Sequence, residues 1–568
     1  MTAKLKDNLK NTAKEILSRR VLLNLLLFAV GLAGVMSVEV FWDYPPFGRV
    51  CYLALAVCCS CFLWRNRTAV FACRRDTVIS AVLVLILFLF NLNGKTIQES
   101  GFLFQRINPS LIYIDLPLLM LATFALVRTL FAVTKNPPAS LLTGETEREE
   151  GKSGFGSGFR SVLIYSAAPF IVNVVYWISF FPSKVSPDTV AQWAQIHGDI
   201  PLTSVHALGH TMFLKALLSI VDSYAIVIFV QILLLSLTVG FICAYLRKKG
   251  VSGVVLMIIS FAITFNQTLN YTILYPWKDL PYTICVMLLT FVFMRIVLDK
   301  GEVSLFWRVV GGLSTAGVYL CRHNGVLIFA FSVLLFLYLS FNFSKRRYLP
   351  VVAIAFALLL GVNAVATYGF GALSRSDGTA YAIFADGVSA VVVNDGDITA
   401  DQMERIEEIF DVDFLKTHYS WSNGNSLLWA DSKAGPEGYE IGPYKSALRL
   451  HGGEIIKLYL ELLPRNIPIM LNEILGSTKI IWAVSGDWLA DNSLQMLFIS
   501  VGIFCVARRR KLLYLLPFAP VFINMLSIAI SATTNELRYL LPTDAVFLLL
   551  VAYSAVAYRE MNKRQVLI

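Results

Sequence analysis

Residues 223–246, SYAIVIFVQILLLSLTVGFICAYL, decide the fold because they form an unbroken apolar run without a charged side chain. About 20 residues at a rise of 1.5 Å each cross the hydrocarbon core of a bilayer, so this run predicts a transmembrane helix. Arg247, Lys248 and Lys249 follow it directly, as is typical of a helix that ends at the cytoplasmic surface. With 57% hydrophobic and 15% charged residues and a mean hydropathy of +0.66, the whole chain is too apolar for an ordinary soluble domain.

Similar apolar runs recur along the 568 residues and predict an all-α polytopic membrane protein with about fourteen transmembrane helices. The predicted spans are 21–41, 47–64, 76–93, 114–134, 161–181, 223–246, 251–270, 280–298, 305–321, 325–342, 349–370, 490–507, 512–531 and 540–557. A long polar segment, 371–489, interrupts them and predicts a mainly helical extracytoplasmic domain. Within it, Thr399 and Gln402 have the spacing of a capping box, and 455–463 and 468–481 are expected to be further helices.

Clusters of basic residues mark one side of the membrane. They lie at 4–20, 65–75, 247–249, 345–347, 508–511 and 559–564, and all fall on the same side when the spans are counted as above. The positive-inside tendency assigns this side to the cytoplasm. We therefore expect a multi-pass plasma-membrane protein with both termini cytoplasmic and with 182–222 and 371–489 outside. These loops account for the net charge of +10, which does not indicate nucleic-acid binding.

The sequence divides into five parts. They are an N-terminal four-helix membrane block (1–134), a cytoplasmic linker rich in Gly, Ser, Pro and charge (135–160), a membrane core (161–370) with the external loop 182–222, the extracytoplasmic domain (371–489) and the C-terminal membrane helices (490–568). The nine cysteines lie almost entirely in or beside apolar spans, and their spacing indicates neither a disulfide framework nor a metal site. We expect no metal and no cofactor.

The most informative polar loop is 186–210, SPDTVAQWAQIHGDIPLTSVHALGH, which holds three of the six histidines. Asp188, after a proline, either caps a short helix at 189–196 or acts as an acid or base at the membrane surface. On such a helix Gln192 and Gln195 would share one face. His206 and His210, four residues apart, would also share a helix face, as zinc ligands, as ordinary polar residues or as part of a phosphate or sugar site.

Three further external segments carry charge beside apolar spans. Trp277-Lys278-Asp279 opens one span, where Lys278 either anchors the interface or meets a phosphate. Arg322-His323-Asn324 is the tip of a helical hairpin and either completes a turn or holds a phosphate. Glu536, Arg538 and Tyr539 precede the last span, as a solvated loop or as part of the same site.

The order of these motifs resembles the GT-C superfamily of bacterial membrane glycosyltransferases, which use polyprenyl-phosphate sugars. The resemblance covers roughly 160–560 and lies in SPDTVAQWAQ with its following histidines, in WKD at 277–279, in RHNG at 322–325 and in ELRYLLP at 536–542. Two departures are visible: four predicted helices precede the acidic loop, and Ala207 stands where proline is expected. The resemblance implies a GT-C-like fold with Asp188 as the catalytic base.

The same resemblance implies an inverting transfer of a sugar from a polyprenyl-phosphate donor to an envelope glycan, lipid or protein on the outer face of the membrane. The residues expected to bind substrate are Gln192, His206, His210, Lys278, Asp279, Arg322, His323, Glu536 and Arg538. Besides donor and acceptor, the expected partner is the lipid bilayer. Two other functions remain open: a polysaccharide polymerase or ligase acting on lipid-linked sugars, and a flippase or transporter of such lipids.

Overall fold

The computed structural model describes most of the chain from Cys73 onward. The described residues are 73–100, 116–137, 142, 155–342, 346–374, 378–421, 426–431, 433–435, 438–440, 442–482, 492–507, 512–531 and 536–563. The spans predicted at 21–41 and 47–64, most of the linker and the basic clusters at 4–20 and 508–511 lie outside these residues.

The chain is a helical membrane protein. Among the described residues, seven helices, some counted with an adjoining short turn, are long and apolar enough to cross a bilayer. They are α6 (Phe155–Ile178), α9 (Tyr224–Lys248), α12 (Asp279–Leu298), α14 (Val326–Asn342), α15 (Leu349–Ala364), α24 (Ala519–Ser531) and α25 (Leu541–Lys563). Beside them lie α4 (Arg74–Ser100), α5 (Leu116–Lys135), α13 (Leu305–Cys321) and α23 (Asn492–Ala507), and the total of fourteen spans stays a prediction.

One predicted span is broken. The segment 251–270 forms α10 (Gly253–Thr264) and α11 (Gln267–Ile273), whose axes differ by 59°. The break has a local cause, because the side chain of Asn266 accepts a hydrogen bond from the backbone N–H of Leu269 and caps the second helix. The span predicted at 251–270 is therefore a bent pair of helices in the structure.

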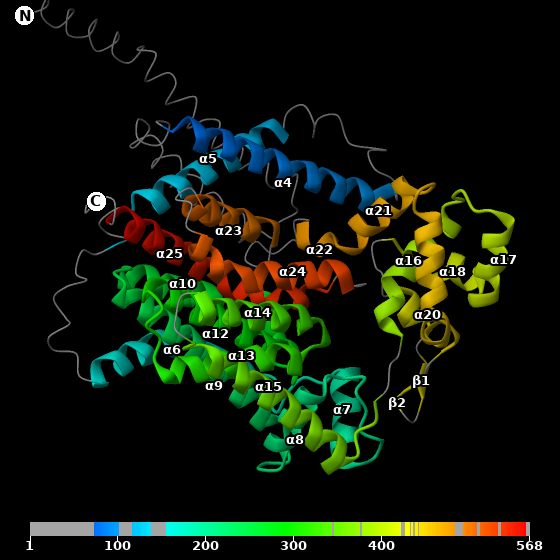
Figure 1. Ribbon diagram of the computed structural model, residues 1–568, viewed down its shortest axis with the longest axis horizontal. Helices are drawn as coiled ribbons and strands as arrows, with labels where there is room; N and C mark the ends of the chain where they lie inside the picture. Colours follow the sequence, from blue (N-terminus) through cyan, green and yellow to red (C-terminus); the bar gives the residue numbers. More distant parts are fainter. Residues whose placement is uncertain are drawn as a thin grey trace, which may run out of the picture.

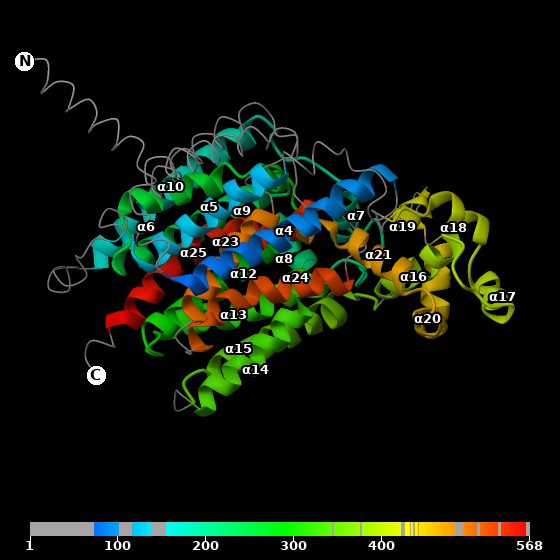
Figure 2. The same cartoon turned by 90° about the horizontal axis from the view of Figure 1, so that it is seen from above.

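The helices run side by side along the long axis of the molecule (Figures 1 and 2). The most apolar stretches of α12 and α25 are 78% and 83% buried and form the centre of the bundle. Those of α6 and α15 are only 28% and 17% buried, so their outer faces present apolar side chains such as Ile178 and Leu360. An apolar rim of this kind suits contact with lipid.

Basic residues from distant parts of the sequence meet at one end of the bundle. Lys249 Nζ lies 2.8 Å from the Asp299 carboxylate, and Arg559 donates a hydrogen bond to the backbone carbonyl of Lys249. Arg347 pairs with Glu302 near the same helix ends. Three of the predicted basic clusters therefore share one end, as the alternating count requires.

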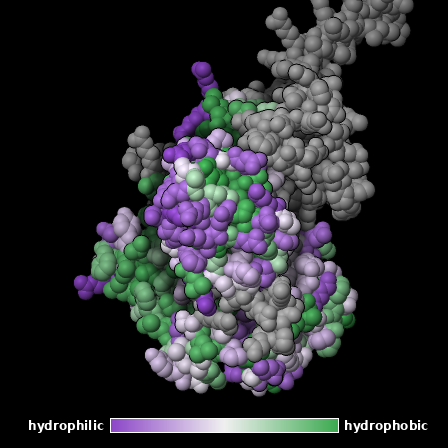
Figure 3. Space-filling model, turned by 90° about the vertical axis from the view of Figure 1, so that its right-hand side faces the viewer, coloured by the Kyte–Doolittle hydropathy of each residue, from purple (hydrophilic) through white to green (hydrophobic). Residues whose placement is uncertain are grey.

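The opposite end carries a separate helical domain, shown in yellow at the right of Figure 1. It contains α16 (Ala382–Val393), α17 (Ala400–Ile409), α18 (Val412–His418), α19 (Ser426–Ala430), α20 (Pro443–Leu462), α21 (Ile467–Ser477) and an antiparallel pair of short strands, β1 (Lys433–Gly435) and β2 (Gly438–Glu440), with α22 (Lys479–Trp482) leading away. The capping box of Thr399 and Gln402 forms as predicted. Seen from this end, hydrophilic side chains gather in the middle of the face, with apolar patches beside them (Figure 3).

Two buried carboxyl groups lie in the core of this domain. Tyr419 donates a hydrogen bond to Glu473, and Tyr444 donates one of 3.4 Å to Asp386. The second oxygen of each carboxyl group is buried without a hydrogen-bond partner in the described part of the chain. Burial raises the pKa of Glu473 to about 8, and burial together with the neighbouring Glu473 raises the pKa of Asp386. The folded domain therefore keeps protons that the unfolded chain would release.

This arrangement predicts that the domain loses stability as the pH rises. Its full stability is expected below the ordinary carboxyl pKa of 4.5, and it should fall as the pH approaches 8, the folded-state value. Pulse proteolysis of 382–477 across this range should show more opening at the alkaline end. Glu473→Gln should flatten the dependence, whereas Glu407→Gln on an exposed face of α17 should not. Equal opening of the wild-type domain at both ends of the range would contradict the prediction.

Candidate functional site

The polar loop 182–222 contains a well-defined helix start. Ser186 is the N-cap of α7 (Pro187–His197), and its side chain and Thr189 form a reciprocal capping box. Asp188 is therefore not the cap, and that alternative for its role was wrong. Its side chain stays 31% exposed and is available for other contacts. Trp277 Nε1 donates a hydrogen bond of 2.7 Å to Ser186 Oγ, which ties this helix start to the start of α12.

Charged side chains from separate segments surround Asp188. Its Oδ2 lies 3.9 Å from Lys278 Nζ and 3.8 Å from Arg538 Nη1. Both distances exceed a hydrogen bond, so the three groups face one another across a gap. Among the described residues, Lys278 Nζ makes no hydrogen bond. Polar groups held at such distances leave room for a bridging oxygen from water or a ligand.

A second carboxylate lies beneath this gap. Asp279 is fully buried, forms a hydrogen-bonded ion pair with Arg322 and has its Oδ2 3.9 Å from Arg538 Nη1. Arg322 ends α13 and Arg538 lies in the turn before α25. A buried carboxylate is costly unless it is paired, so Asp279 holds these two helix ends together. Glu536 pairs with Arg538 from the other side.

Aromatic rings hold the two guanidinium groups. Arg538 Cζ lies 4.5 Å from the ring centre of Trp277, and Arg322 Cζ lies 4.2 Å from that of Tyr539. Stacking of this kind fixes the plane of an arginine and leaves its N–H edge for an anion. Sequence reasoning missed this role of Trp277 and Tyr539, although both stand next to a predicted site residue.

The local charges keep Asp188 ionised. Partial burial raises its pKa, but Lys278, His206, Arg538 and Arg322 together outweigh burial and hold the pKa below the usual range of a carboxyl group. His206 lies close enough to contribute and is largely buried. As the structure stands, the carboxylate is therefore charged at neutral pH.

The two histidines do not share a helix face, contrary to expectation. His206 lies before the N-cap of α8 (Leu208–Leu218), and His210 lies within the helix. Gln192 Nε2 lies 3.1 Å from His210 Nδ1 and 2.9 Å from Thr211 Oγ1, which joins α7 to α8. Burial, with nearby Lys278 and His206, lowers the pKa of His210 to about 3, so its ring is neutral. His210 and Gln192 thus hold α7, the helix that carries Asp188, against α8.

His323 follows Arg322 in the chain and contacts the polar loop. It is in the short turn η2 (His323–Gly325), and its Nε2 is 3.2 Å from the backbone carbonyl of Ser204. A side chain at Gly325 would place Cβ 1.9 Å from the Val318 carbonyl oxygen, so the RHNG turn requires glycine there. His323 therefore joins the hairpin tip to the loop 182–222. The residues that the structure describes contain no group of three or more His, Cys, Asp or Glu side chains suited to a metal ion.

Comparison of the chain with protein-family models, curated proteins and solved structures found no match. We therefore infer function from the cluster formed by Asp188, Lys278, Asp279, Arg322, Glu536 and Arg538.

The geometry predicts different effects for the two aspartates. Asp279→Asn leaves Arg322 buried without its counter-charge, and breaking one side of a buried pair costs about 3–5 kcal/mol. Thermal unfolding in detergent should therefore show a clear loss of stability. Asp188→Asn removes a partly exposed carboxylate with longer contacts and should unfold close to the wild-type temperature. A stable Asp279→Asn protein would show that the ion pair does not hold the helix ends.

Proposed function

We propose that the protein is an inverting glycosyltransferase that moves a sugar from a polyprenyl-phosphate donor to an envelope glycan, lipid or protein. The observation that carries the proposal is the gap between the Asp188 carboxylate and the cations Lys278 and Arg538, at distances of 3.9 and 3.8 Å. An ionised carboxylate facing two cations is suited to take a proton on one side while an anion departs on the other.

The reaction follows from these groups. The acceptor hydroxyl gives its proton to the Asp188 carboxylate, and its oxygen bonds to the anomeric carbon. The bond from that carbon to the phosphate oxygen breaks, and its electron pair leaves with the lipid phosphate. Attack opposite the departing group inverts the anomeric centre. Negative charge grows on the phosphate, where Lys278 and Arg538 stabilise it, and Arg322 adds charge from the layer below.

We also propose on which side of the membrane the site lies and which fold the chain has. The site lies at the end of the bundle that carries the helical domain, opposite the basic end, which fits an external active site and cytoplasmic termini. A GT-C-like fold with about fourteen spans is part of the same proposal.

Cysteine accessibility tests the sidedness. Cysteine placed at the exposed position of Glu404 on α17 should react with an impermeant maleimide in intact cells. Cysteine at Lys248, exposed at the basic end, should react only after permeabilisation. The unsubstituted protein gives the background of its native cysteines. The reverse labelling pattern would place the site on the cytoplasmic side and contradict binding of the donor at the outer face.

Asp188→Asn tests the catalytic base. The amide keeps the shape but cannot accept the proton, so transfer should fall by about 10²–10⁴, the usual contribution of a general base. The measurement is transfer of labelled sugar from polyprenyl phosphate by purified enzyme in vesicles. Asp188→Glu should restore part of the rate because it restores a carboxylate. Turnover by Asp188→Asn at the wild-type rate would exclude Asp188 as the base.

Neutral substitutions of the cations should weaken donor binding. Hydrogen bonds to charged groups are worth about 1.5–3 kcal/mol each, which predicts a roughly ten- to hundred-fold loss for Lys278→Met and for Arg538→Gln. Arg538→Lys should recover only part, because a point charge does not replace the stacked fork. Competition with polyprenyl phosphate measures the donor affinity.

The matched control is Lys184→Met. This lysine lies 4.2 Å from the ring centre of Phe180 and is not among the cations that lower the pKa of Asp188. It should bind donor like the wild type. Wild-type donor affinity in both Lys278→Met and Arg538→Gln would place the phosphate elsewhere.

A further inference from the structure

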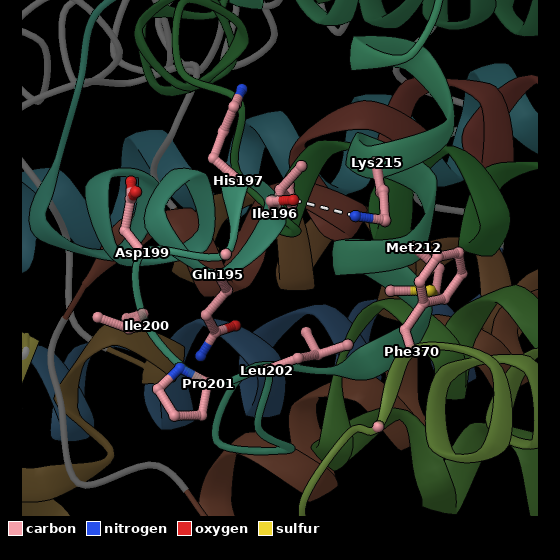
Figure 4. Close-up of a pocket in the computed structure, with 12 residues that line it drawn as sticks. Gln195, Ile196, His197, Asp199, Ile200, Pro201, Leu202, Met212, Lys215 and Phe370 are labelled. Carbon is pink, nitrogen blue, oxygen red and sulfur yellow. Dashed lines mark hydrogen bonds between the residues drawn. The ribbon is translucent and has the colours of Figure 1, made fainter.

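A separate hollow of about 500 Å³ lies at the other end of α7. Figure 4 shows Gln195 between Asp199 and Ile200 on one side and Phe370 and Met212 on the other. Gln195 is seven positions after Asp188, which corresponds to a rise of about 10 Å along the helix. The hollow is therefore distinct from the charged gap but connected to it by one short helix.

The basic side chains that line the hollow already have polar partners. Lys215 Nζ donates a hydrogen bond of 3.0 Å to the Ile196 carbonyl and lies 4.9 Å from the ring centre of Phe370. The two ring nitrogens of His197 lie 3.0 Å from the Trp193 carbonyl and 2.9 Å from Asp222. With Asp199 adding a negative charge, the lining favours an uncharged ligand over an anion.

The hollow contains a buried hydrogen-bond acceptor that has no donor among the described residues. Gln195 is 8% exposed, and its Nε2 donates a hydrogen bond of 3.1 Å to Thr203. Its Oε1 is buried without a hydrogen-bond partner among the described residues. A buried amide oxygen in this state is costly, and a ligand hydroxyl would satisfy it.

The opposite wall is apolar. The Phe370 side chain is half exposed, and Leu202 and Met212 lie beside it. Apolar walls with a few fixed polar groups are typical of small-molecule sites. A sugar ring has the matching character, since its hydroxyl groups donate at the edge while its C–H face packs against apolar carbon.

We infer that this hollow binds an uncharged sugar unit of the acceptor, away from the hydroxyl group that reacts at Asp188. The inference rests on the proposed function and narrows it: the acceptor is an extended glycan, because a single sugar cannot occupy both places. The backbone supports this position. Leu373 N–H donates to the Leu202 carbonyl at 2.9 Å, and Ser204 N–H donates to the Leu373 carbonyl at 3.0 Å. The hollow thus borders the segment 370–373, which precedes the helical domain.

Binding of neutral oligosaccharides to the full-length protein in nanodiscs tests the inference. The probes are a series from monosaccharides to longer chains, with inorganic pyrophosphate as the charged alternative. At least one longer oligosaccharide should bind the wild type saturably. Gln195→Met and Phe370→Ala should each weaken it about three- to ten-fold, as expected for one lost hydrogen bond or apolar contact. Val190→Ala, on the exposed face of the same helix, is the matched control and should bind normally.

Chain length separates this subsite from the reaction centre. In transfer assays Gln195→Met and Phe370→Ala should raise KM for long acceptors with little change in kcat. They should have little effect on transfer to short acceptors. Asp188→Asn, in contrast, should lower kcat and keep oligosaccharide binding. Failure of every neutral oligosaccharide to bind, wild-type binding by both hollow variants, or binding of pyrophosphate there in place of sugars would overturn the inference. If transfer depends on Asp188 but both hollow variants behave as the wild type, the subsite fails and the proposed function stands. If the hollow binds glycan but no sugar moves from polyprenyl phosphate, the proposed function fails instead.

Discussion

The end of the bundle that carries the Asp188 cluster depends on one buried carboxylate. Asp279 has no exposed surface on its side chain and starts a central helix, so its negative charge must be met by cations from other helices. Arg322 and Arg538 meet it, and this requirement brings the end of α13 and the start of α25 to the start of α12. Arg538 then stacks on Trp277, and Trp277 donates to Ser186. A single chain of contacts leads from the buried charge to the helix that carries Asp188.

Polar contacts of this kind help to position helices in a bilayer. Apolar helices gain little hydrophobic driving force from one another in lipid, so packing and a few polar contacts set their positions. Here such contacts lie at both ends of the bundle. Lys249 and Asp299 join helix ends at the basic end, as Asp279 and Arg322 do at the other. The axial register between α12 and its neighbours is thereby fixed twice, which allows side chains from distant loops to be positioned at the site.

The sequence was most informative where length and charge alone decide the structure. Apolar runs predicted the long helices, and the alternation of basic clusters correctly placed Asp188, Lys278, Arg322 and Arg538 at one end. It failed where a tertiary contact decides. His206 and His210 have helical spacing, yet the chain turns at Ala207, and the helix begins only at Leu208. Arg322 pairs with Asp279, and the His323 ring contacts the backbone carbonyl of Ser204. No local sequence pattern specifies these partners. The hollow at Gln195 had only one signal, the shared face of Gln192 and Gln195, and that face predicts burial without indicating a ligand.

The lowered pKa of Asp188 is unfavourable for its proposed role, because a carboxylate surrounded by cations is a weak base. The conflict is resolved by the donor. Lys278 and Arg538 are among the cations that lower the pKa of Asp188 across the gap. A donor phosphate placed between them supplies negative charge next to the carboxylate, which raises its pKa toward the ordinary range and strengthens it as a base. Departure of the phosphate adds further negative charge at the moment when the proton arrives. On the proposed function, the cations that bind the donor therefore also determine when Asp188 can act, so proton transfer is coupled to the presence of the lipid phosphate.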